Sequence, residues 1–472
     1  MRIVVRVAGL LLLAAAGKSG TASAQDSTAK ITYKGVTITP IGFFAAEGLA
    51  RQRSQYGDIG SNFNSIPFSS ATNGRLTEIR GSARQSRLGV AVDSKVGDVK
   101  LGGYFEGDFL SAGVTSNSNE SNSYTFRVRQ FWGQAAFANG WTVSFGQSWS
   151  LMTTNKNGVA LRGEAIPLTI DAQYAAGFNW ERQFGVRLTK KIDDHLTWAI
   201  AVEESQQLFA ARSAPAQLII GATGGPLLNS TANYSNDYLP DVSTKLAWDP
   251  GYGHYELKLL GRAFRDRIVD TLGTFGGSRN TRAFGGGIGL GMILPVKVDN
   301  RNVADIGLSV LWGSGIGRYG TSTLPDITVT DSGQVVGIPA TQFMLSIETH
   351  PTTNLDVYGY VGAEYNERAA YLSTAGKGVG YGSTLNDLSF CDREVPPTGP
   401  YAPGTSTCNA DTRSLSQANI GFWYRFYRGS AGTMQWGMQY SYTSRGIWSG
   451  KNGQEPQAVD NMLFTAVRYY LP

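Results

Sequence analysis

The sequence predicts an all-β fold, a transmembrane antiparallel β-barrel of about sixteen strands with short periplasmic turns and long extracellular loops. Three observations predict it. Segments of about 10–14 residues alternate apolar and polar side chains, as the strands of a membrane barrel do. The connections between them alternate between short and long. Only 16% of the 472 residues are charged, below the roughly 25% typical of soluble domains, whereas glycine (59) and tyrosine (22) are abundant.

Because apolar and polar residues alternate in these segments, none of them contains a long continuous apolar run. In "DVKLGGYFEGDFL" (98–110), Val99, Leu101 and Phe105 share one face, and Lys100 and Glu106 lie on the other. In a membrane barrel the apolar face contacts lipid and the polar face lines the lumen. No segment after the N-terminal region approaches 18 consecutive apolar residues, which excludes a helical membrane protein.

Connection lengths carry the strongest signal. The short connections contain Gly, Asn, Asp and Pro, as turns do; they fall at 96–98, 138–140, 191–195, 249–253, 296–302, 350–354 and 428–432. The long polar connections fall near 51–79, 111–123, 150–175, 206–238, 266–281, 315–340, 367–413 and 444–458. Fifteen connections imply sixteen strands, with both termini on the short-turn side. A soluble β-helix or a multi-domain sandwich would not sort its connections by length in this way.

The N-terminus predicts export. Arg2 and Arg6 precede an apolar run, 7–16, and a small-residue stretch ends at Ala24. This order is typical of a signal peptide, with cleavage expected after Ala24. The expected organisation is a signal peptide (1–24), a short periplasmic lead (25–35) and the barrel (36–472). Removing the signal lowers the formal net charge from +5 to +2, which argues against a nucleic-acid partner.

Charged residues on the polar face are candidates for lining the pore and setting its selectivity. By alternation they are Arg87, Lys100, Glu106, Asp108, Arg127, Arg129, Arg187, Glu203, Glu256, Lys258 and Arg262. For most of them, a merely solvated lumen residue is the simpler interpretation. Arg127 and Arg129 stand out, because "TFRVRQFWGQAAF" (125–137) places both on one face with no acid beside them. The apolar/polar phase slips at residues 130–132, where either a bulge or the membrane boundary is expected.

The third long connection, 150–175, is a candidate for folding into the barrel and narrowing it. Arg162, Glu164 and Asp171 would then lie at the constriction.

The two cysteines, Cys391 and Cys408, fall in one Pro- and Gly-rich segment of an exported protein. This placement predicts a disulfide that closes that loop.

No catalytic or metal-binding motif is present, so neither an activity nor a cofactor is expected. The three histidines, His195, His254 and His350, fall at expected periplasmic turns without metal-site spacing. Two other functions stay open. An outer-membrane barrel enzyme, lipase- or protease-like, would need a histidine near Ser, Asp or Glu at the outer rim. An adhesin-like barrel would bind a partner through its long loops without conducting ions. A plug-bearing receptor would need a longer N-terminal lead than the one expected here.

Several phrases resemble the DcaP-type porins of Gram-negative outer membranes. They are "ARQSRLGVAVD" (83–93), "FRVRQFWG" (126–133), "FGQSWS" (145–150), "PDVSTKLAW" (240–248) and "GSGIGRY" (313–319). The resemblance spans most of the expected mature chain and implies a homotrimer of sixteen-stranded barrels in the outer-membrane lipid. It also implies passive diffusion of small hydrophilic solutes, with a preference for anions such as dicarboxylates. The chain departs from the family in ending "YYLP" (469–472) and in lacking an N-terminal coiled-coil segment.

Overall fold

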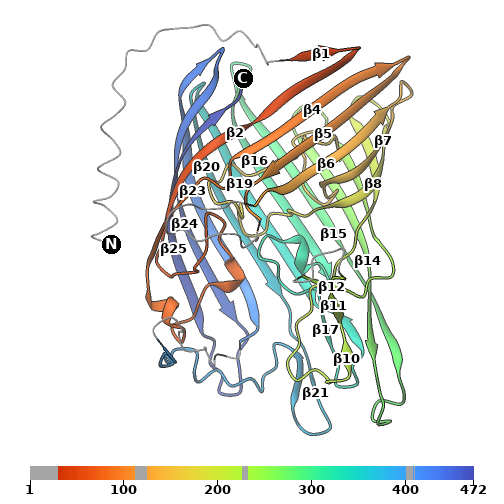
Figure 1. Cartoon of the computed structure of the whole chain (residues 1–472), viewed down its shortest axis with the longest axis vertical. Helices are drawn as coiled ribbons and strands as arrows, with labels where there is room; N and C mark the ends of the chain where they lie inside the picture. Colours follow the sequence, from red (N-terminus) through yellow and green to blue (C-terminus); the bar gives the residue numbers. More distant parts are fainter. Residues whose placement is uncertain (1–29, 112–124, 226–231, 400–407, 409) are drawn as a thin grey trace.

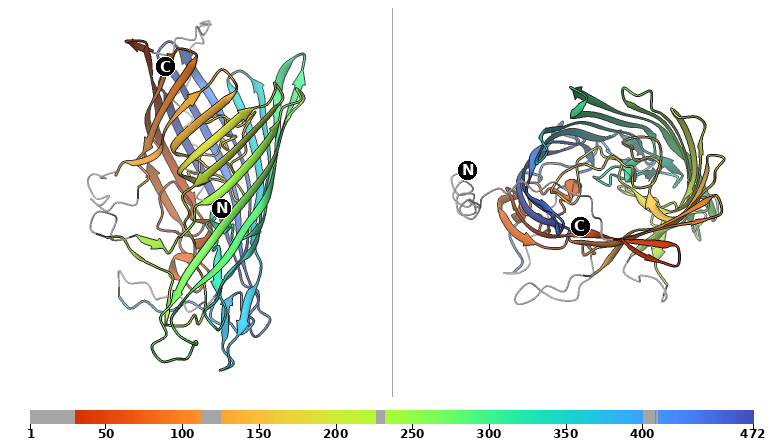
Figure 2. Two further views of the ribbon diagram at one scale, coloured as in Figure 1. Left: turned by 90° about the vertical axis from the view of Figure 1, so that its right-hand side faces the viewer. Right: turned by 90° about the horizontal axis from the view of Figure 1, so that it is seen from above.

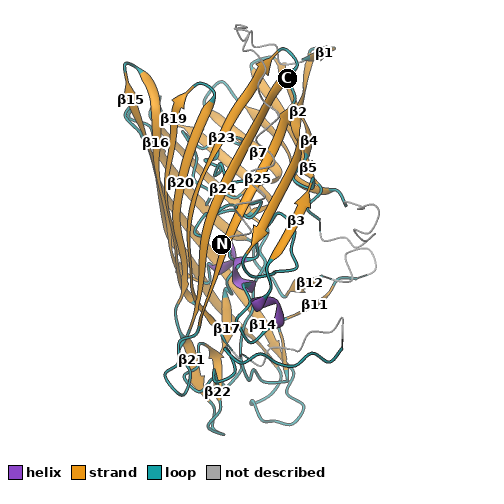
Figure 3. Ribbon diagram, turned by 90° about the vertical axis from the view of Figure 1, so that its left-hand side faces the viewer, coloured by secondary structure: helices purple, strands orange, loops and turns teal. Residues whose placement is uncertain are grey.

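The computed structural model describes residues 30–111, 125–225, 232–399, 408 and 410–472. The expected signal peptide and its cleavage site after Ala24 lie outside the described residues. Strands form the wall of the molecule, and the three short 3₁₀ helices of the described residues belong to long connections between strands (Figure 3). None of the helices in the described ranges is long and apolar enough to cross a membrane.

One closed antiparallel sheet of sixteen barrel strands makes the wall, which confirms the predicted fold (Figures 1 and 2). Its strands are β2 (Val36–Arg51), β3 (Glu78–Ser82) with β4 (Arg87–Val96), β5 (Val99–Asp108), β6 (Arg127–Ala136), β7 (Trp141–Trp149), β8 (Arg182–Lys191), β9 (Leu196–Glu203), β13 (Asp241–Trp248), β14 (His254–Ile268), β15 (Arg279–Val298), β16 (Arg301–Ser314), β19 (Pro339–Thr352), β20 (Leu355–Asn366), β23 (Thr412–Gly429), β24 (Gly432–Ile447) and β25 (Gln457–Tyr470). Both β3 and β4 pair with β2, so together they make one interrupted barrel strand. Pairing of β2 with β25 closes the barrel.

The remaining elements are small. They are β1 (Ile31–Tyr33), β10 (Leu218–Ile219), β11 (Gly221–Thr223), β12 (Asn233–Ser235), β17 (Ile327–Val329), β18 (Val335–Gly337), β21 (Ala369–Leu372), β22 (Gly378–Tyr381), η1 (Phe63–Ser65), η2 (Thr72–Arg75) and η3 (Gly317–Tyr319). Strand β1 pairs with β2, and β10 pairs with β14. The other small strands form hairpins within the long loops.

The two ends of the barrel differ, as the connection lengths predict. Turns such as 97–98, 299–300 and 430–431 lie at one end, together with the C-terminus and β1 (Figure 1, top). Long connections lie at the opposite end; their described parts include 52–77, 204–225, 232–240, 315–338 and 367–399. We call these ends the short-turn end and the long-loop end.

The wall is apolar outside and polar inside. On β14, Leu257 and Leu259 are 45% and 46% exposed, whereas the intervening Lys258 is 1% exposed. Exposed apolar side chains recur on the outer face of other strands, among them Phe131, Phe145, Phe184, Phe284, Ile288, Leu290, Trp312, Leu345, Ile347 and Ile420. A face of this kind matches the lipid-facing band of a membrane barrel.

The structure explains why strand β15 is rich in glycine. Phe284, Ile288 and Leu290 point outward and are exposed, while glycines occupy the inner face. A Cβ atom at Gly291 would lie 3.0 Å from Thr154 Oγ1 and 2.7 Å from Glu256 Oε2. The glycines therefore leave room for a loop to pack against the inside of the wall.

The hydrophobic core lies inside the barrel, because long loops fold into it (Figure 2, right). Connection 52–77 contributes Ile59 and Phe63, and connection 150–181 contributes Ile170 and Phe178. They pack with inward-facing wall residues, which include Tyr358, Tyr360, Trp423, Met462 and Phe464. The lumen is thus largely filled, and the space left to a solute is set by these loops.

Candidate functional site: the loop-filled lumen

Arg127 and Arg129 of β6 lie inside the barrel, and both are paired with carboxylates of the neighbouring strand. Arg127 forms a bidentate ion pair with Asp108, and both of its hydrogen bonds are 2.9 Å long. Arg129 donates to Glu106 (2.7 Å) and Asp108 (2.8 Å) on the neighbouring β5. The expectation that no acid lies beside the two arginines is therefore wrong: the acids are distant in sequence but adjacent in the sheet.

A β-bulge sits where the phase of β6 slips. Gly107 pairs with Val128 and Glu106 pairs with Gln130, so Arg129 is the extra residue. Phe131 then points outward, 64% exposed, and Trp132 points inward and is buried. The bulge turns Arg129 deeper into the lumen, as such irregularities re-aim side chains. There its third partner is the hydroxyl of Tyr174, at 2.8 Å.

Connection 150–181 crosses the lumen from wall to wall. On one side the backbone N–H of Asn155 donates to Glu256 of β14 (2.8 Å). Farther round the wall, opposite β7 and β8 where the loop begins and ends, Leu168 N–H donates to the Tyr360 hydroxyl of β20 (2.8 Å) and Leu168 C=O accepts from Trp423 of β23 (2.7 Å). We call residues 150–181 the crossing loop.

Two buried lysines hold the start of the crossing loop. Lys245 and Lys258 are 0–1% exposed and both pair with Glu256, at 2.9 and 3.3 Å. Lys245 also donates to Thr153 C=O (2.6 Å), and Lys258 donates to Thr154 Oγ1 (2.8 Å). We call Lys245, Lys258 and Glu256 the lysine cluster. Buried charges are tolerated where they are paired and hydrogen-bonded.

Arg262 anchors a second loop in the same way. Its guanidinium pairs with Asp241 of β13 (3.0 Å) and with Asp326 of connection 315–338 (2.8 Å). Asp241 also accepts from the Tyr319 hydroxyl (2.9 Å), and Asp326 accepts from Arg318 N–H (2.9 Å). Arg262 is thus buried by a loop that folds inward.

The three constriction candidates occupy different settings. Glu164 is buried and bridges Asn155 in a hairpin of the crossing loop. Asp171 is buried and accepts from Ser61 N–H (3.0 Å), which ties the crossing loop to connection 52–77. Arg162 lines a cavity, and its guanidinium lies 4.7 Å from the Tyr104 ring centroid.

The other interior candidates also divide into anchors and lining residues. Arg187 donates to Trp149 C=O (2.6 Å), and Glu203 accepts from Ser150 Oγ (2.7 Å), so both hold the start of the crossing loop. Arg87 lies 3.8 Å from Glu106 and lines a cavity. Lys100 is exposed at the rim of the short-turn end, where it faces Lys95 of β4.

The crossing loop lines two cavities that open toward the short-turn end. A cavity of about 620 Å³ lies against β2, β4, β5, β20 and β23–β25, and we call it the arginine chamber. Its charged lining residues are Arg87, Arg162, Arg425, Arg428, Arg468, Glu106 and Asp356. A pocket of about 380 Å³ lies against β14–β16, β19 and β20, and we call it the mixed-charge pocket. A third cavity, of about 600 Å³, lies on the long-loop side beside Glu181 and Arg318.

Two loops join at the long-loop end. Cys391 and Cys408 form a disulfide with Cα atoms 4.4 Å apart. Cys391 packs with Ile66 and Phe68 of connection 52–77, and its C=O accepts from Ser70 N–H (2.9 Å). The bridge therefore sits where connection 367–411 covers the barrel.

Replacing Arg129 by glutamine is expected to lower the free energy of unfolding by about 2–3 kcal/mol, because buried Asp108 and Glu106 lose a charged donor. Arg127→Gln is the matched control. The Arg127 side chain is 35% exposed against 2% for Arg129, so its loss is expected to cost less than about 1 kcal/mol. Urea unfolding followed by tryptophan fluorescence measures both. Equal losses would contradict the anchoring role of Arg129.

Sequence patterns miss several residues of this site. Lys245 could have been found by alternation, because it shares a face of β13 with Asp241 and Ser243. Tyr174 and Asp326 belong to loops, whose sequences have no strand periodicity, so alternation could not predict that they contact the wall.

A closed sixteen-stranded antiparallel barrel, apolar outside and narrowed by an inward loop, defines a porin-type barrel. The outer membrane channel DcaP of Acinetobacter baumannii has a similar structure, with a TM-score of 0.64 and 17% identity over 93% of this chain and 99% of that one. Two further structures are less similar. OmpF of Salmonella typhi has a TM-score of 0.49 and 9% identity over 94% of this chain and 100% of that one. An anion-selective porin from Comamonas acidovorans has a TM-score of 0.48 and 12% identity over 92% of this chain and 100% of that one. No family model matches the chain, and no curated protein matches its sequence. The predicted resemblance to DcaP-type barrels is confirmed for the fold.

Proposed function

We propose that the protein is a porin of the outer membrane, through which small hydrophilic solutes diffuse passively. One observation carries this proposal: an apolar outer wall encloses cavities lined by charged side chains on both sides of an inward loop. Export through a cleaved signal peptide and assembly as a homotrimer belong to the same proposal and rest on the sequence. Filtering is steric and electrostatic, and it needs neither a cofactor nor a chemical step.

The arginine chamber supports a preference for anions. Five guanidinium groups and two carboxylates line it. Within the described part of the chain, Arg162 and Arg428 have no carboxylate within 4 Å, so their charge is available to a passing solute. A dicarboxylate could contact two of these groups at once, which is why we include dicarboxylates in the proposal. The preference thus rests on Arg162 and Arg428 rather than on the paired Arg127 and Arg129.

Reversal potentials across a planar bilayer in a salt gradient test this selectivity. The wild-type protein is expected to prefer chloride over potassium, and Arg162→Gln is expected to reduce the permeability ratio by roughly twofold, because one unpaired charge is lost from a confined lumen. Arg393→Gln, an exposed arginine of connection 367–411, is the matched control and should leave the ratio unchanged. Cation preference in the wild type would overturn the anion proposal.

A further inference from the structure

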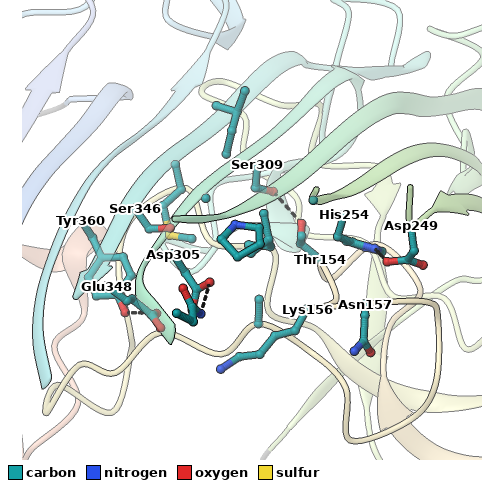
Figure 4. A pocket seen from close by; sticks show the side chains of 18 of the residues that line it. Thr154, Lys156, Asn157, Asp249, His254, Asp305, Ser309, Ser346, Glu348 and Tyr360 are labelled. Atoms are coloured by element: carbon teal, nitrogen blue, oxygen red, sulfur yellow. Dashed lines mark hydrogen bonds and ion pairs between the residues drawn. The ribbon is translucent and has the colours of Figure 1, made fainter. Parts of the chain in front are cut away.

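The mixed-charge pocket differs from the arginine chamber in its chemistry. Its lining contains acids, a lysine and a set of apolar side chains within about 380 Å³. That volume lies in the range of small-molecule sites, which combine an apolar body with a few placed polar groups. Figure 4 shows the polar residues of the pocket, which include Asp249 paired with His254 (2.7 Å) beside Asn157.

The acidic side comes from the wall. Glu348 of β19 accepts from the Tyr360 hydroxyl (2.6 Å), and Asp305 of β16 accepts from Asn302 Nδ2 (2.9 Å). In the described ranges, Glu348 has no cationic group within 4 Å. In the same ranges, the one basic side chain within 4 Å of Asp305 is His350, at 3.4 Å. Both carboxylates line the pocket, so they can accept from an ammonium group of a ligand.

The basic side comes from the crossing loop. Lys156 is exposed to the pocket, and among the residues whose contacts are described it has no carboxylate within 4 Å. Its own backbone is fixed, because Lys156 N–H donates to Gly163 C=O (2.7 Å). The amide of Asn157 lies beside it on the same side of the pocket (Figure 4). An ammonium and an amide together suit a carboxylate.

Apolar side chains line the same pocket. Phe178 and Met344, which are both buried, line the pocket together with Ile293, Pro295 and Leu308. They offer a surface for an aliphatic or aromatic group. Gly307 and Gly253 also line the pocket and take up little of its space.

We propose that this pocket binds zwitterions that carry an apolar group, such as α-amino acids with large apolar side chains. The ligand ammonium contacts Glu348 and Asp305, its carboxylate contacts Lys156 and Asn157, and its side chain lies on Phe178 and Met344. The inference rests on the proposed pore, since the pocket lies inside its lumen. Binding is nevertheless measurable without permeation.

Isothermal titration calorimetry on the folded protein in detergent tests the proposal with three probes of one shape. L-Phenylalanine carries both charges, 3-phenylpropionate only the carboxylate, and 2-phenylethylamine only the ammonium. The zwitterion is expected to bind about tenfold more tightly than either analogue, the size expected for one charge-assisted contact. Lys156→Gln and Glu348→Gln should each weaken L-phenylalanine binding by about the same factor.

Lys95→Gln, an exposed lysine at a short turn, is the matched control and should bind like the wild type. Far-ultraviolet circular dichroism confirms that each variant is folded. Equal affinity for 3-phenylpropionate and L-phenylalanine, or no effect of Glu348→Gln, would overturn the zwitterion assignment. So would the absence of binding in a protein that still conducts ions, an outcome that leaves the pore proposal standing.

Discussion

Replacing Glu256 by glutamine is expected to lower the free energy of unfolding by about 3–5 kcal/mol, the cost of breaking a buried ion pair. Glu256 is fully buried and accepts from Lys245 (2.9 Å) and from Asn155 N–H (2.8 Å). Glutamine keeps the shape but leaves two buried ammonium groups facing no negative charge. It also weakens the attachment of the crossing loop to the wall.

Urea unfolding followed by tryptophan fluorescence measures this loss. Glu204→Gln is the matched control, because Glu204 is exposed just after β9, a strand that does not pair with β14, and its loss should change stability by less than about 0.5 kcal/mol. A double variant, Glu256→Gln with Lys258→Met, is expected to recover part of the loss, since it removes one of the uncompensated charges. A Glu256→Gln variant as stable as the wild type would show that the lysine cluster does not hold the loop.

Shortening the crossing loop is expected to raise single-channel conductance roughly twofold or more, because the loop occupies the cross-section of the barrel. Asn155 and Glu164 are bridge partners, so replacing residues 157–162 by Gly-Gly leaves the anchors on either side in place. The change removes Val159, which packs against Leu151 and Ala199, and Arg162, which covers Tyr104. Planar-bilayer recordings measure the conductance.

A matched control shortens a long connection that lies outside the lumen. Residues 271–276 between β14 and β15 are largely exposed, so their replacement by Gly-Gly should leave conductance unchanged. Liposome swelling with sugars of increasing size adds a steric readout, and the shortened crossing loop should admit larger sugars. Unchanged conductance and unchanged size exclusion would show that the hairpin of the crossing loop does not limit passage.

The wall of the barrel could be predicted from the sequence because alternation and turn residues both act between residues that are close in the chain. Alternation assigned Lys258 and Arg262 to the inside, and turn residues set the short connections. The same alternation put Arg127 inside and Val128 outside, whereas the bulge lies at Arg129, just before the slip expected at 130–132.

The filling of the lumen could not be predicted in this way. A charged side chain that points into the lumen contacts either water or a side chain of a loop, and which of the two depends on which loop folds against it. Asp326 reaches Arg262 and Tyr174 reaches Arg129 across more than forty residues of chain. Asp108 was available for Arg127 and Arg129, but the pairing follows from strand register, which the sequence pattern alone leaves open.

The most direct test of the central claim is single-channel recording of the intact protein in a planar bilayer. The proposed porin predicts stepwise, reproducible conductance increments that are stable at low voltage. A folded, membrane-inserted protein that stays electrically silent would contradict the claim and would favour a barrel that binds a partner through its long loops.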